Sequence, residues 1–432
     1  MGPLSFRYFF YMEFKVENLE EFKIKALYFA QTFEVFCYLD SNNIKEAYSK
    51  FDALLAIGVR NEVSATEVNA FGKLEAFKTN NPGWLAGYLS YDLKNEIEDL
   101  VSNNADGLGF PDLYFFSPQI TIIIKGNLVE INGDNEQEIY HTILGQKAQI
   151  PPIKPNITLK EKFTKPEYLA TVEKIKNHIQ QGDIYVSNFC HEFFAEDVAI
   201  NPISIFTWLM QISPTPFAAL FKHRSHYTVC ASPERFLCKR GNKLVSQPIK
   251  GTAKRGKDIK EDEAIKSALK NNTKELQENV MIVDLVRNDL TRSAKQGTVQ
   301  TEDLFGIYSF NQVHQMISTI SCELADDISE IQAIKNTFPM GSMTGAPKIK
   351  AMQLMEQYER SKRGPYSGAI GYFSPDGDFD FNVTIRSLFY NQQNKYLSFQ
   401  VGSAITYHAN GMQEYEECLL KAKAILEVLG VD

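Results

Sequence analysis

Cysteine is scarce in this sequence, and no two cysteines have the spacing of a metal or redox site. The 432 residues contain six cysteines and no Cys-x-x-Cys pair: Cys37, Cys190, Cys230, Cys238, Cys322 and Cys418. Neither a zinc site nor a disulfide framework is therefore indicated. Cysteine usage of this kind is typical of a protein in a reducing cytoplasm.

Long hydrophobic runs and an excess of positive charge are also missing. No apolar stretch approaches the length of a membrane-spanning helix. The aromatic run over residues 8–12 is too short for a signal peptide, and we expect a first strand there. The net charge of −8 argues against a broad nucleic-acid-binding surface. With 44% hydrophobic and 23% charged residues, the composition is that of a soluble globular protein of one large or two ordinary domains.

Strand patterns dominate the first 150 residues. Residues 84–92 and 119–125 have the composition of buried strands, and Gly126-Asn127 ends the second. Prolines then interrupt a polar segment that we expect to be a linker: Pro151, Pro152, Pro155 and Pro166.

Helical spacing follows from Tyr168 to Ile179, with Gly182 as the predicted cap. Residues 183–189 and 227–231 are predicted strands, and residues 375–377 are a predicted hairpin turn.

Two pairs of glutamates stand near predicted helix starts. Glu275 and Glu278 follow Thr273, a predicted N-cap, and Glu414 and Glu417 begin a predicted helix over residues 411–429 that Gly430 ends. Residues three apart share a helix face. For either pair alone, the helix dipole explains the negative charge. Four converging carboxylates without histidine would suit Mg²⁺, but the sequence does not show that the two helices meet.

Three further stretches have features of an anion site. Residues 341–348 form a glycine-bounded turn that leads into a helix and presents N–H groups, although the spacing is not that of a P-loop. Arg386 lies in a predicted apolar strand, either at a sheet edge or directed into a site. Gly402 lies inside another predicted strand, which indicates close backbone approach.

Lys250 lies in the sequence Pro248-Ile249-Lys250-Gly251-Thr252. Because Lys254, Arg255 and Lys257 follow, a solvated basic loop would explain this lysine by itself. Its significance depends on the other stretches.

Taken together, these stretches resemble the chorismate-utilising enzyme family, which includes component I of anthranilate synthase, component I of aminodeoxychorismate synthase, and the isochorismate and salicylate synthases. The resemblance is strong over about residues 160–432 and weaker at residues 39–41 and 84–92. The motifs that carry it are residues 182–185, 232–236, 278–289, 345–348, 363–368 and 414–417.

Lys250 and Val186 point to one subgroup of that family. Aminodeoxychorismate synthases similar to this chain have lysine within Pro-Ile-Lys-Gly-Thr, whereas anthranilate synthases usually have alanine. Isochorismate and salicylate synthases have a water-activating lysine at the position of Val186, and valine cannot do that work. The resemblance therefore implies amination of chorismate at C4 to 4-amino-4-deoxychorismate, towards 4-aminobenzoate and folate, with anthranilate synthase component I as the alternative.

The resemblance also implies catalytic roles. Mg²⁺ on Glu278 and Glu417, with Glu275 and Glu414 acting through water, would offset the ring carboxylate. Glu234 would protonate the departing C4 hydroxyl. Lys250 would add at C2 to give a covalent intermediate, from which ammonia at C4 displaces it.

Substrate contacts are implied in the same way. Arg386 and Tyr366 would hold the enolpyruvyl carboxylate. The rest of the site would be lined by Thr344, Gly251, Thr252, Gly402 and Lys421. Many relatives have histidine at the position of Gln315, and we assign the neighbouring His314 no catalytic role.

No glutaminase motif is recognisable, so we expect a separate glutaminase subunit to deliver ammonia. A non-catalytic relative with a degraded site is the rival from another class, and the intact Glu234, Glu278, Arg386 and Glu417 argue against it. Family members can hold tryptophan in an N-terminal pocket, and the weak match there leaves that open for this chain.

The fold that the resemblance implies is a mixed α/β (α+β) assembly like that of anthranilate synthase component I. Two large, mostly antiparallel sheets are expected to face each other with helices outside. Residues 1–150 would contribute strands to the same body as a chorismate-binding catalytic domain over residues 160–432.

Overall fold

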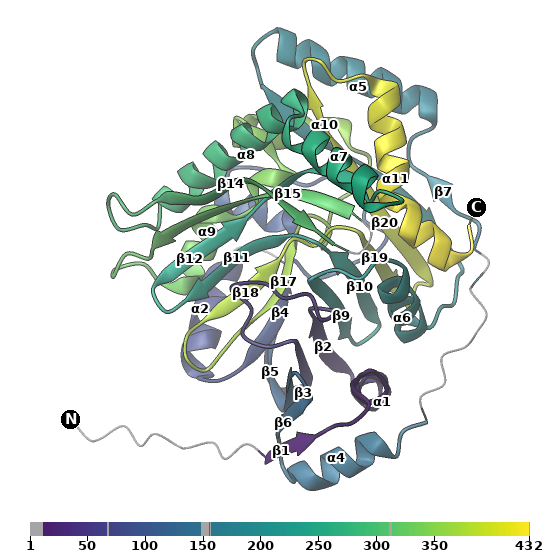
Figure 1. Ribbon diagram of the computed structural model, residues 1–432, viewed down its shortest axis with the longest axis vertical. Coiled ribbons are helices and arrows are strands. Elements are labelled where there is room, and N and C mark those ends of the chain that lie inside the picture. The colour runs from purple at the N-terminus through teal and green to yellow at the C-terminus, as the bar shows by residue number, and fades with distance from the viewer. Residues whose placement is uncertain (1–11, 67–68, 148–154, 156, 311–312, 432) are drawn as a thin grey trace.

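The computed structural model describes residues 12–66, 69–147, 155, 157–310 and 313–431 (Figure 1). The expected strand over residues 8–12 lies outside these ranges except for Met12, and so do Pro151 and Pro152. Pro166 does not belong to a linker, because it lies in the first turn of α5 (Lys165–Gln180). Proline is favourable there, since the first N–H groups of a helix have no intrahelical partner.

Hydrogen bonds join the strands into one continuous sheet, and every strand pair among the described residues is antiparallel. The long strand β5 (Leu113–Lys125) pairs with β3, β4 and β6, so two arms diverge from it. The first arm continues through β3 (Ala53–Ala65), β2 (Val35–Asp40), β9 (Phe217–His223), β10 (His226–Ser232), β19 (Ser387–Asn391), β20 (Tyr396–Thr406) and β8 (Val186–Ala195).

The second arm runs from β5 to the strand that carries Lys250. Its members are β4 (Leu85–Leu89), β17 (Ala369–Phe373), β18 (Phe379–Asn382), β11 (Arg235–Arg240), β12 (Lys243–Gln247) and β15 (Val313–Glu323), which also pairs with β13 (Ile249–Lys254) and β14 (Gln300–Ser309). Four short strands complete the sheet: β1 (Met12–Lys15) and β6 (Leu128–Asn132) beside β5, and β7 (Lys160–Glu161) and β16 (Gly345–Ala346) beside β8.

The two arms face each other across a shared apolar core. Phe221 and Phe389 of the first arm belong to the same buried cluster as Phe373 and Phe381 of the second. The mixed α/β class with antiparallel strands is thus confirmed, and the two expected sheets are arms of one sheet. Strands from the first 150 residues pair directly with later ones, as β2 does with β9 and β4 with β17.

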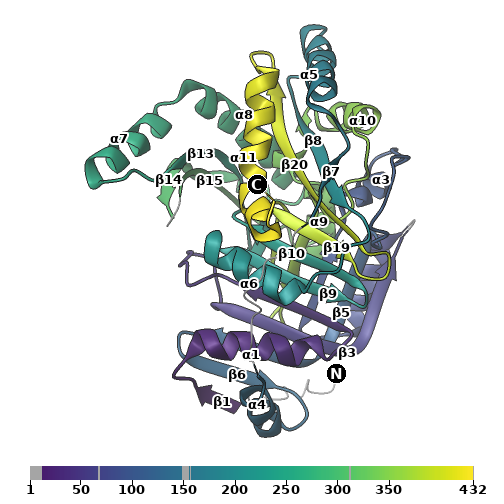
Figure 2. The ribbon, with the colours of Figure 1, turned by 90° about the vertical axis from the view of Figure 1, so that its right-hand side faces the viewer.

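Helices cover the outer faces of both arms (Figures 1 and 2). A second buried cluster lies between the first arm and α1 (Leu19–Gln31), α4 (Glu136–Leu144), α5, α6 (Pro202–Ile212), α10 (Lys348–Tyr358) and α11 (Gly411–Leu429). On the second arm, α8 (Thr273–Thr291) packs on β15, with α9 (Glu330–Thr337) and α2 (Ala70–Asn80) beyond it. The remaining helices are α3 (Lys94–Ile97), α7 (Ile259–Lys270), η1 (Tyr91–Leu93) and η2 (Gly341–Met343).

Most predicted elements are present, with shifted ends. The strand predicted at residues 84–92 is β4 followed by η1, and the strand predicted at 183–189 starts only at Val186. The hairpin turn at 375–377 joins β17 to β18 as predicted. Gly182 and Gly430 follow their helices with φ of 84° and 70°, a conformation that glycine adopts without steric cost.

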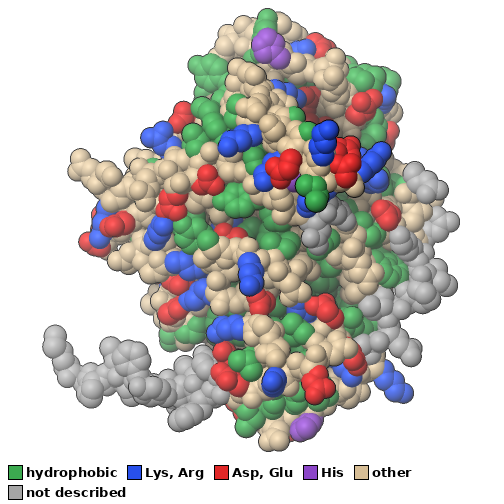
Figure 3. Space-filling view, viewed as in Figure 1, with side chains coloured by type: hydrophobic (Ala, Val, Ile, Leu, Met, Phe, Trp, Pro, Cys, Tyr) green, Lys and Arg blue, Asp and Glu red, His purple; other side chains and the backbone are tan. Residues whose placement is uncertain are grey.

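Surface and interior features agree with the composition. On the face shown in Figure 3, basic and acidic side chains are interspersed. The six cysteines are all free and buried. Every helix in the described part of the chain is too short or too polar to cross a bilayer.

Candidate active site

The N-termini of α8 and α11 lie side by side, which the sequence left open. Nζ of Lys274 lies 3.3 Å from Oε1 of Glu414 and 3.9 Å from Oε1 of Glu278. The N-cap of α8 is Asn272, not Thr273 as predicted. The amide oxygen of Asn272 accepts from the N–H groups of Lys274 and Glu275, which satisfies two unpaired donors of the first turn.

All four predicted glutamates lie in this region. Burial raises the pKa of Glu275, Glu278 and Glu414, and the nearby Glu417 charge raises the pKa of each further. Burial opposes ionisation of Glu417 too, but Lys421, whose Nζ lies 2.6 Å from Oε1 of Glu417, holds its pKa below the ordinary value. The carboxylates therefore form one coupled acidic group that gains from added positive charge.

The four glutamates can be compared with the oxygen ligands that a magnesium ion needs. In the described ranges, no three His, Cys, Asp or Glu side chains form a group that could hold a metal ion, so the magnesium site stays a prediction. Oε1 of Glu278, however, is buried without a hydrogen-bond partner. Because Mg²⁺ usually takes one or two protein carboxylates and completes its shell with water and substrate oxygens, Glu278 and Glu417 have the chemistry that it needs.

A small, partly open cavity adjoins Glu278. It lies where β8, β13, β20, α8 and the turn over residues 341–345 meet. Its lining is Val186, Asn188, Lys250, Glu278, Met281, Ile282, Gly341, Ser342, Thr344, Gly345 and Ala404. Lys250, Glu278 of α8 and the glycine-bounded turn are distant in sequence, and the fold brings them to one cavity.

Lys250 lies at an irregularity of β13. The register between β13 and β15 shifts between Ile249 and Thr252, and Gly251 within the shift has φ of 96°. A Cβ on Gly251 would lie 3.3 Å from Oε2 of Glu275, so strand and helix approach closely there. Lys250 is half-buried and forms no hydrogen bond or ion pair with a described residue, which leaves its amine available to a ligand.

Glu234 is buried in the turn between β10 and β11, with only 4% of its surface exposed. Burial raises the pKa of Glu234 to about 7, against the opposing influence of the Ser342 hydroxyl and the Lys250 charge. The backbone holds this position firmly, because the N–H of Val383 donates to the Glu234 carbonyl at 3.0 Å. A pKa raised in this direction lets the carboxyl group keep a proton near neutral pH, as a general acid requires.

Arg386 is not in a strand, contrary to the prediction. It has φ of 50° and lies in the connection between β18 and β19, where this left-handed residue interrupts the ladder. Burial lowers the pKa of Arg386, and the Glu234 charge opposes this shift. The Arg386 side chain forms no ion pair with a described residue, and its direction into the site stays a prediction.

The other residues predicted to contact the substrate lie at different places relative to the cavity. Tyr366 is buried in the turn after Arg363, and Thr344 is buried beside the cavity. Nζ of Lys421 donates to the Gly402 carbonyl at 2.9 Å, and a Cβ on Gly402 would lie 2.9 Å from Nδ2 of Asn188. Thr252 is exposed. Ten of the thirteen predicted site residues lie outside the lining of this cavity: Gly251, Thr252, Glu234, Tyr366, Arg386, Gly402, Lys421, Glu275, Glu414 and Glu417.

Sequence reasoning missed two polar residues of the cavity. Ser342 lies inside the glycine-bounded turn of residues 341–348, so the sequence contained enough information to predict its hydroxyl as a site group. Asn188 follows the 182–185 motif by three positions and gave no signal of its own. His314 is held at both ring nitrogens, 3.0 Å from Oδ1 of Asp262 and 2.8 Å from Oγ of Ser309. Both ring nitrogens of His314 are therefore engaged by neighbouring side chains.

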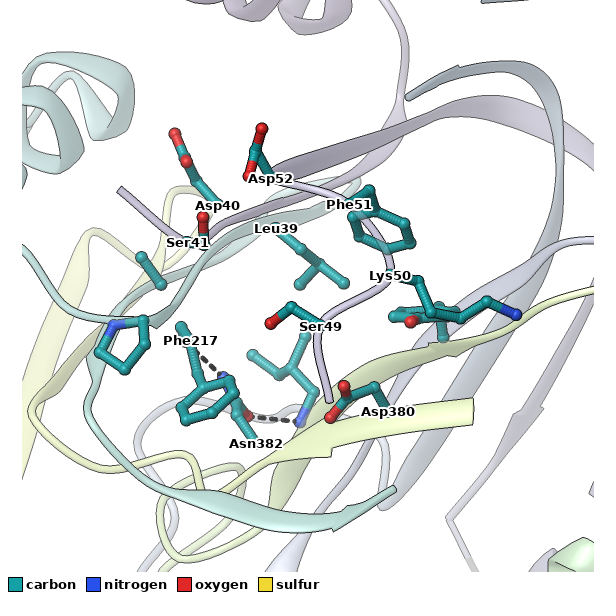
Figure 4. A pocket seen from close by; sticks show the side chains of 14 residues that line it. Leu39, Asp40, Ser41, Ser49, Lys50, Phe51, Asp52, Phe217, Asp380 and Asn382 are labelled. Atoms are coloured by element: carbon teal, nitrogen blue, oxygen red, sulfur yellow. Dashed lines mark hydrogen bonds between the residues drawn. The ribbon is translucent and has the colours of Figure 1, made fainter. Parts of the chain in front are cut away.

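A second pocket lies between the arms near the N-terminal region (Figure 4). Its wall includes residues 39–41, the stretch of weaker resemblance, together with Lys50, Phe51 and Asp380. Asn382 closes one side, because its side chain donates to the Phe217 carbonyl and accepts from the Ile370 N–H. The carboxylate of Asp40 is already engaged by Lys23, Tyr38 and Asn42.

Known proteins resemble this chain in sequence and in fold. Residues 32–427 match the family of chorismate binding enzymes. The chain is 34% identical to an anthranilate synthase component I-like protein of Synechocystis over 80% of this chain and 72% of that protein. It is 31% identical to aminodeoxychorismate synthase component 1 of Bacillus subtilis and to anthranilate synthase component 1 of Thermus thermophilus, each over 80% of this chain and 77% of the relative.

Two solved structures share the fold. Anthranilate synthase component I from Streptococcus pneumoniae superimposes with a TM-score of 0.76 at 24% identity, covering 88% of this chain and 93% of that one. The menaquinone-specific isochorismate synthase of Escherichia coli gives 0.77 at 15% identity, covering 97% and 94%. From the family match and the level of identity to these relatives, the chain belongs to the family of chorismate binding enzymes.

Proposed function

We propose that this protein aminates chorismate at C4 to give 4-amino-4-deoxychorismate, with ammonia from a separate glutaminase subunit. The observation that carries the proposal is the position of Lys250, whose side chain lines the same cavity as Glu278, Ser342 and Thr344. A primary amine that forms no hydrogen bond or ion pair with a described residue is suited, once deprotonated, to nucleophilic attack on a bound ring. Bacillus subtilis aminodeoxychorismate synthase component 1 is among the relatives, which supports the assignment.

In the proposed reaction, Arg386 and Tyr366 hold the enolpyruvyl carboxylate, because a partner-free guanidinium can bind a planar carboxylate through two hydrogen bonds. The Lys250 amine then forms a bond to C2. The ring double bonds shift, the C4–O bond breaks, and Glu234 supplies the proton with which the hydroxyl leaves as water. Ammonia bonds to C4 and the reverse shift releases Lys250, so that overall one ammonia replaces one hydroxyl.

Charge on the ring carboxylate has to be offset for this chemistry. Glu278 and Glu417 are the residues that would hold a magnesium ion, which when bound supplies positive charge at the ring carboxylate, with Glu275 and Glu414 further out. Thr344, Gly251, Thr252, Gly402 and Lys421 would complete the walls around the substrate. We place the reaction in the cytoplasm, in 4-aminobenzoate and folate synthesis.

Anthranilate synthase component I is the second candidate, and the relatives of that name favour it. It differs in the position that is aminated and in the release of pyruvate. Lys250 discriminates between the two, since amination without a covalent intermediate gives this lysine no chemical role.

Product identity tests the proposal. The purified chain is incubated with chorismate, Mg²⁺ and ammonium chloride at high pH. The products are then separated and identified by mass spectrometry and fluorescence. We expect a non-aromatic 4-amino product that an added lyase converts to 4-aminobenzoate. Fluorescent anthranilate with pyruvate would overturn the proposal while leaving the family assignment intact. If nothing forms, the assay is repeated with a glutaminase subunit and glutamine, and continued absence of both products would reject both candidates.

A further inference from the structure

Arg363 is a fully buried arginine to which the proposed mechanism gives no role. Its side chain is 1% exposed and forms an ion pair with Glu359, whose side chain is 7% exposed. Nε and one terminal nitrogen donate to the two oxygens of Glu359 at 2.9 and 2.7 Å. The guanidinium also lies 4.4 Å from the centre of the Tyr91 ring. Glu359 thus balances the charge of the guanidinium and the Tyr91 ring stacks on it, while further N–H donors of Arg363 remain for other contacts.

Those remaining donors reach three separate segments. Nη1 donates to the Met343 carbonyl at 2.7 Å and to Oγ of Ser367 at 3.4 Å, and Nη2 donates to the Asn188 carbonyl at 2.8 Å. Counted with the Glu359 bonds, all five N–H donors of the guanidinium have acceptors.

Each segment that Arg363 contacts carries a residue of the candidate site. The Met343 carbonyl lies between Ser342 and Thr344, which line the cavity, and Asn188 of β8 lines it as well. Ser367 directly follows Tyr366. The chain after Ser367 stays tied to the approach to Arg386, because the Ser367 N–H donates to the Thr384 carbonyl at 2.9 Å.

Glu359 extends the same connection. One of its oxygens accepts from the N–H of Cys190, two residues beyond Asn188, at 3.0 Å. The N–H of Asn188 in turn donates to the Thr344 carbonyl at 2.8 Å. The glycine-bounded turn, β8 and the Tyr366 turn are therefore held to one planar group, whose geometry fixes their separation.

We propose that Arg363 is a positioning residue for chorismate: it sets the distance between the turn with Ser342 and Thr344 and the turn with Tyr366. The inference rests on the proposed substrate site, and it is independent of which position of chorismate is aminated. Lysine keeps the charge but offers three donors from one point, so Arg363→Lys cannot hold all three segments.

The test compares Arg363→Lys with Arg240→Lys, measuring chorismate affinity by calorimetry, KM and kcat, and the unfolding midpoint. Arg240 is a matched control, because it too donates to backbone carbonyls, of Tyr48 and Phe379, and pairs with Asp380, away from the cavity. Both variants should lose stability. We expect R363K to weaken chorismate binding and raise KM by roughly tenfold, and R240K to leave both unchanged.

Rescue by added guanidinium ion is a second measurement, because it would not change chorismate affinity if Arg363 had only a structural role. Low millimolar guanidinium should restore chorismate affinity to Arg363→Ala and leave Arg240→Ala unaffected. If R363K does not fold, Glu359→Gln takes its place, with the same expected direction and a smaller change. Unchanged KM and affinity in R363K or E359Q, with stability lost as in R240K, would overturn the proposal. Anthranilate from the wild-type chain would reject the proposed function and leave this inference standing.

Discussion

Lys274 on α8 and Glu414 on α11 join the two helix N-termini through an ion pair of 3.3 Å. The residues are 140 positions apart in the chain. Both helix dipoles direct their positive ends towards the same acidic group. The Lys274 ammonium adds positive charge there, and nearby Glu278 and Glu414 help to raise the pKa of Lys274 against its burial. A divalent cation at these carboxylates would therefore have to compete with this lysine.

Removing that competition should tighten magnesium binding. Lys274→Met is expected to bind Mg²⁺ about two- to fivefold more tightly, because a half-exposed ion pair is worth about 0–1 kcal/mol. Calorimetric titration of the chorismate-free protein measures the change. Lys266→Met, which removes an equal charge from α7, is the control and should bind Mg²⁺ as the wild type does. Weaker binding in K274M would show that Lys274 organises the carboxylates instead of competing for them.

Glu234 should set the alkaline limit of activity. With its pKa raised to about 7 by burial, the acid form declines above neutrality, so kcat/KM for chorismate, measured at a constant concentration of free ammonia, should fall about tenfold per pH unit above roughly pH 7. Glu234→Gln should lose about 10²–10⁴-fold in turnover, typical of a missing general acid. A pH profile of both proteins tests this. If kcat/KM of E234Q still declines above neutral pH as it does in the wild type, the general acid is another group.

The same carboxyl group should also make stability depend on pH. A carboxyl group whose folded pKa exceeds the unfolded value holds its proton more tightly when folded, so its favourable contribution is full below about pH 4.5 and is lost as the pH rises through about 7. We therefore expect E234Q to melt above the wild type at pH 8, with the difference shrinking towards pH 5. Thermal unfolding at both values measures it, and a difference that grows on acidification would contradict the assigned direction.

Lys250→Ala should abolish formation of the 4-amino product and with it any covalent adduct. When chorismate is supplied without ammonia, the wild type should gain the mass of chorismate less one water, since the C4 hydroxyl leaves as the amine adds. Intact-protein mass spectrometry detects this gain. Lys254→Ala, an exposed lysine on the same strand, is the control and should form the adduct. Turnover of K250A at the wild-type rate would favour the anthranilate synthase reaction.

Local features of this chain could be predicted from sequence because they depend on local physics. The apolar spacing after Gly411 and the glycine at 430 were enough to give α11 its bounds, Gly411–Leu429. The cap of α8 was misplaced by one residue, because Asn272 and Thr273 are both good capping residues and only the backbone decides between them.

The site itself depends on contacts that no local pattern encodes. The meeting of α8 with α11 arises from how the two arms of the sheet are covered, and the Lys274–Glu414 pair is its result. The break of the strand at Arg386 could not be foreseen, because an apolar run before and after an arginine has the same pattern whether the ladder continues or not. Arg363 likewise belongs to a recognisable motif, but the acceptors of its five N–H donors lie in segments that only the fold brings together.

Asp289 and Lys348 form a buried ion pair, with Nζ 2.6 Å from Oδ2, that ties α8 to the start of α10. Nζ of Lys348 also donates to the Pro339 carbonyl at 2.8 Å, so the pair holds the turn of residues 341–345 against the helix that carries Glu278. Asp289→Leu would leave the buried ammonium uncompensated and should cost about 3–5 kcal/mol of unfolding free energy. Adding Lys348→Met removes that charge, so the double variant should recover part of the loss. Urea unfolding of the four proteins of this cycle gives the coupling, and additive losses would mean that the two side chains stabilise the turn independently.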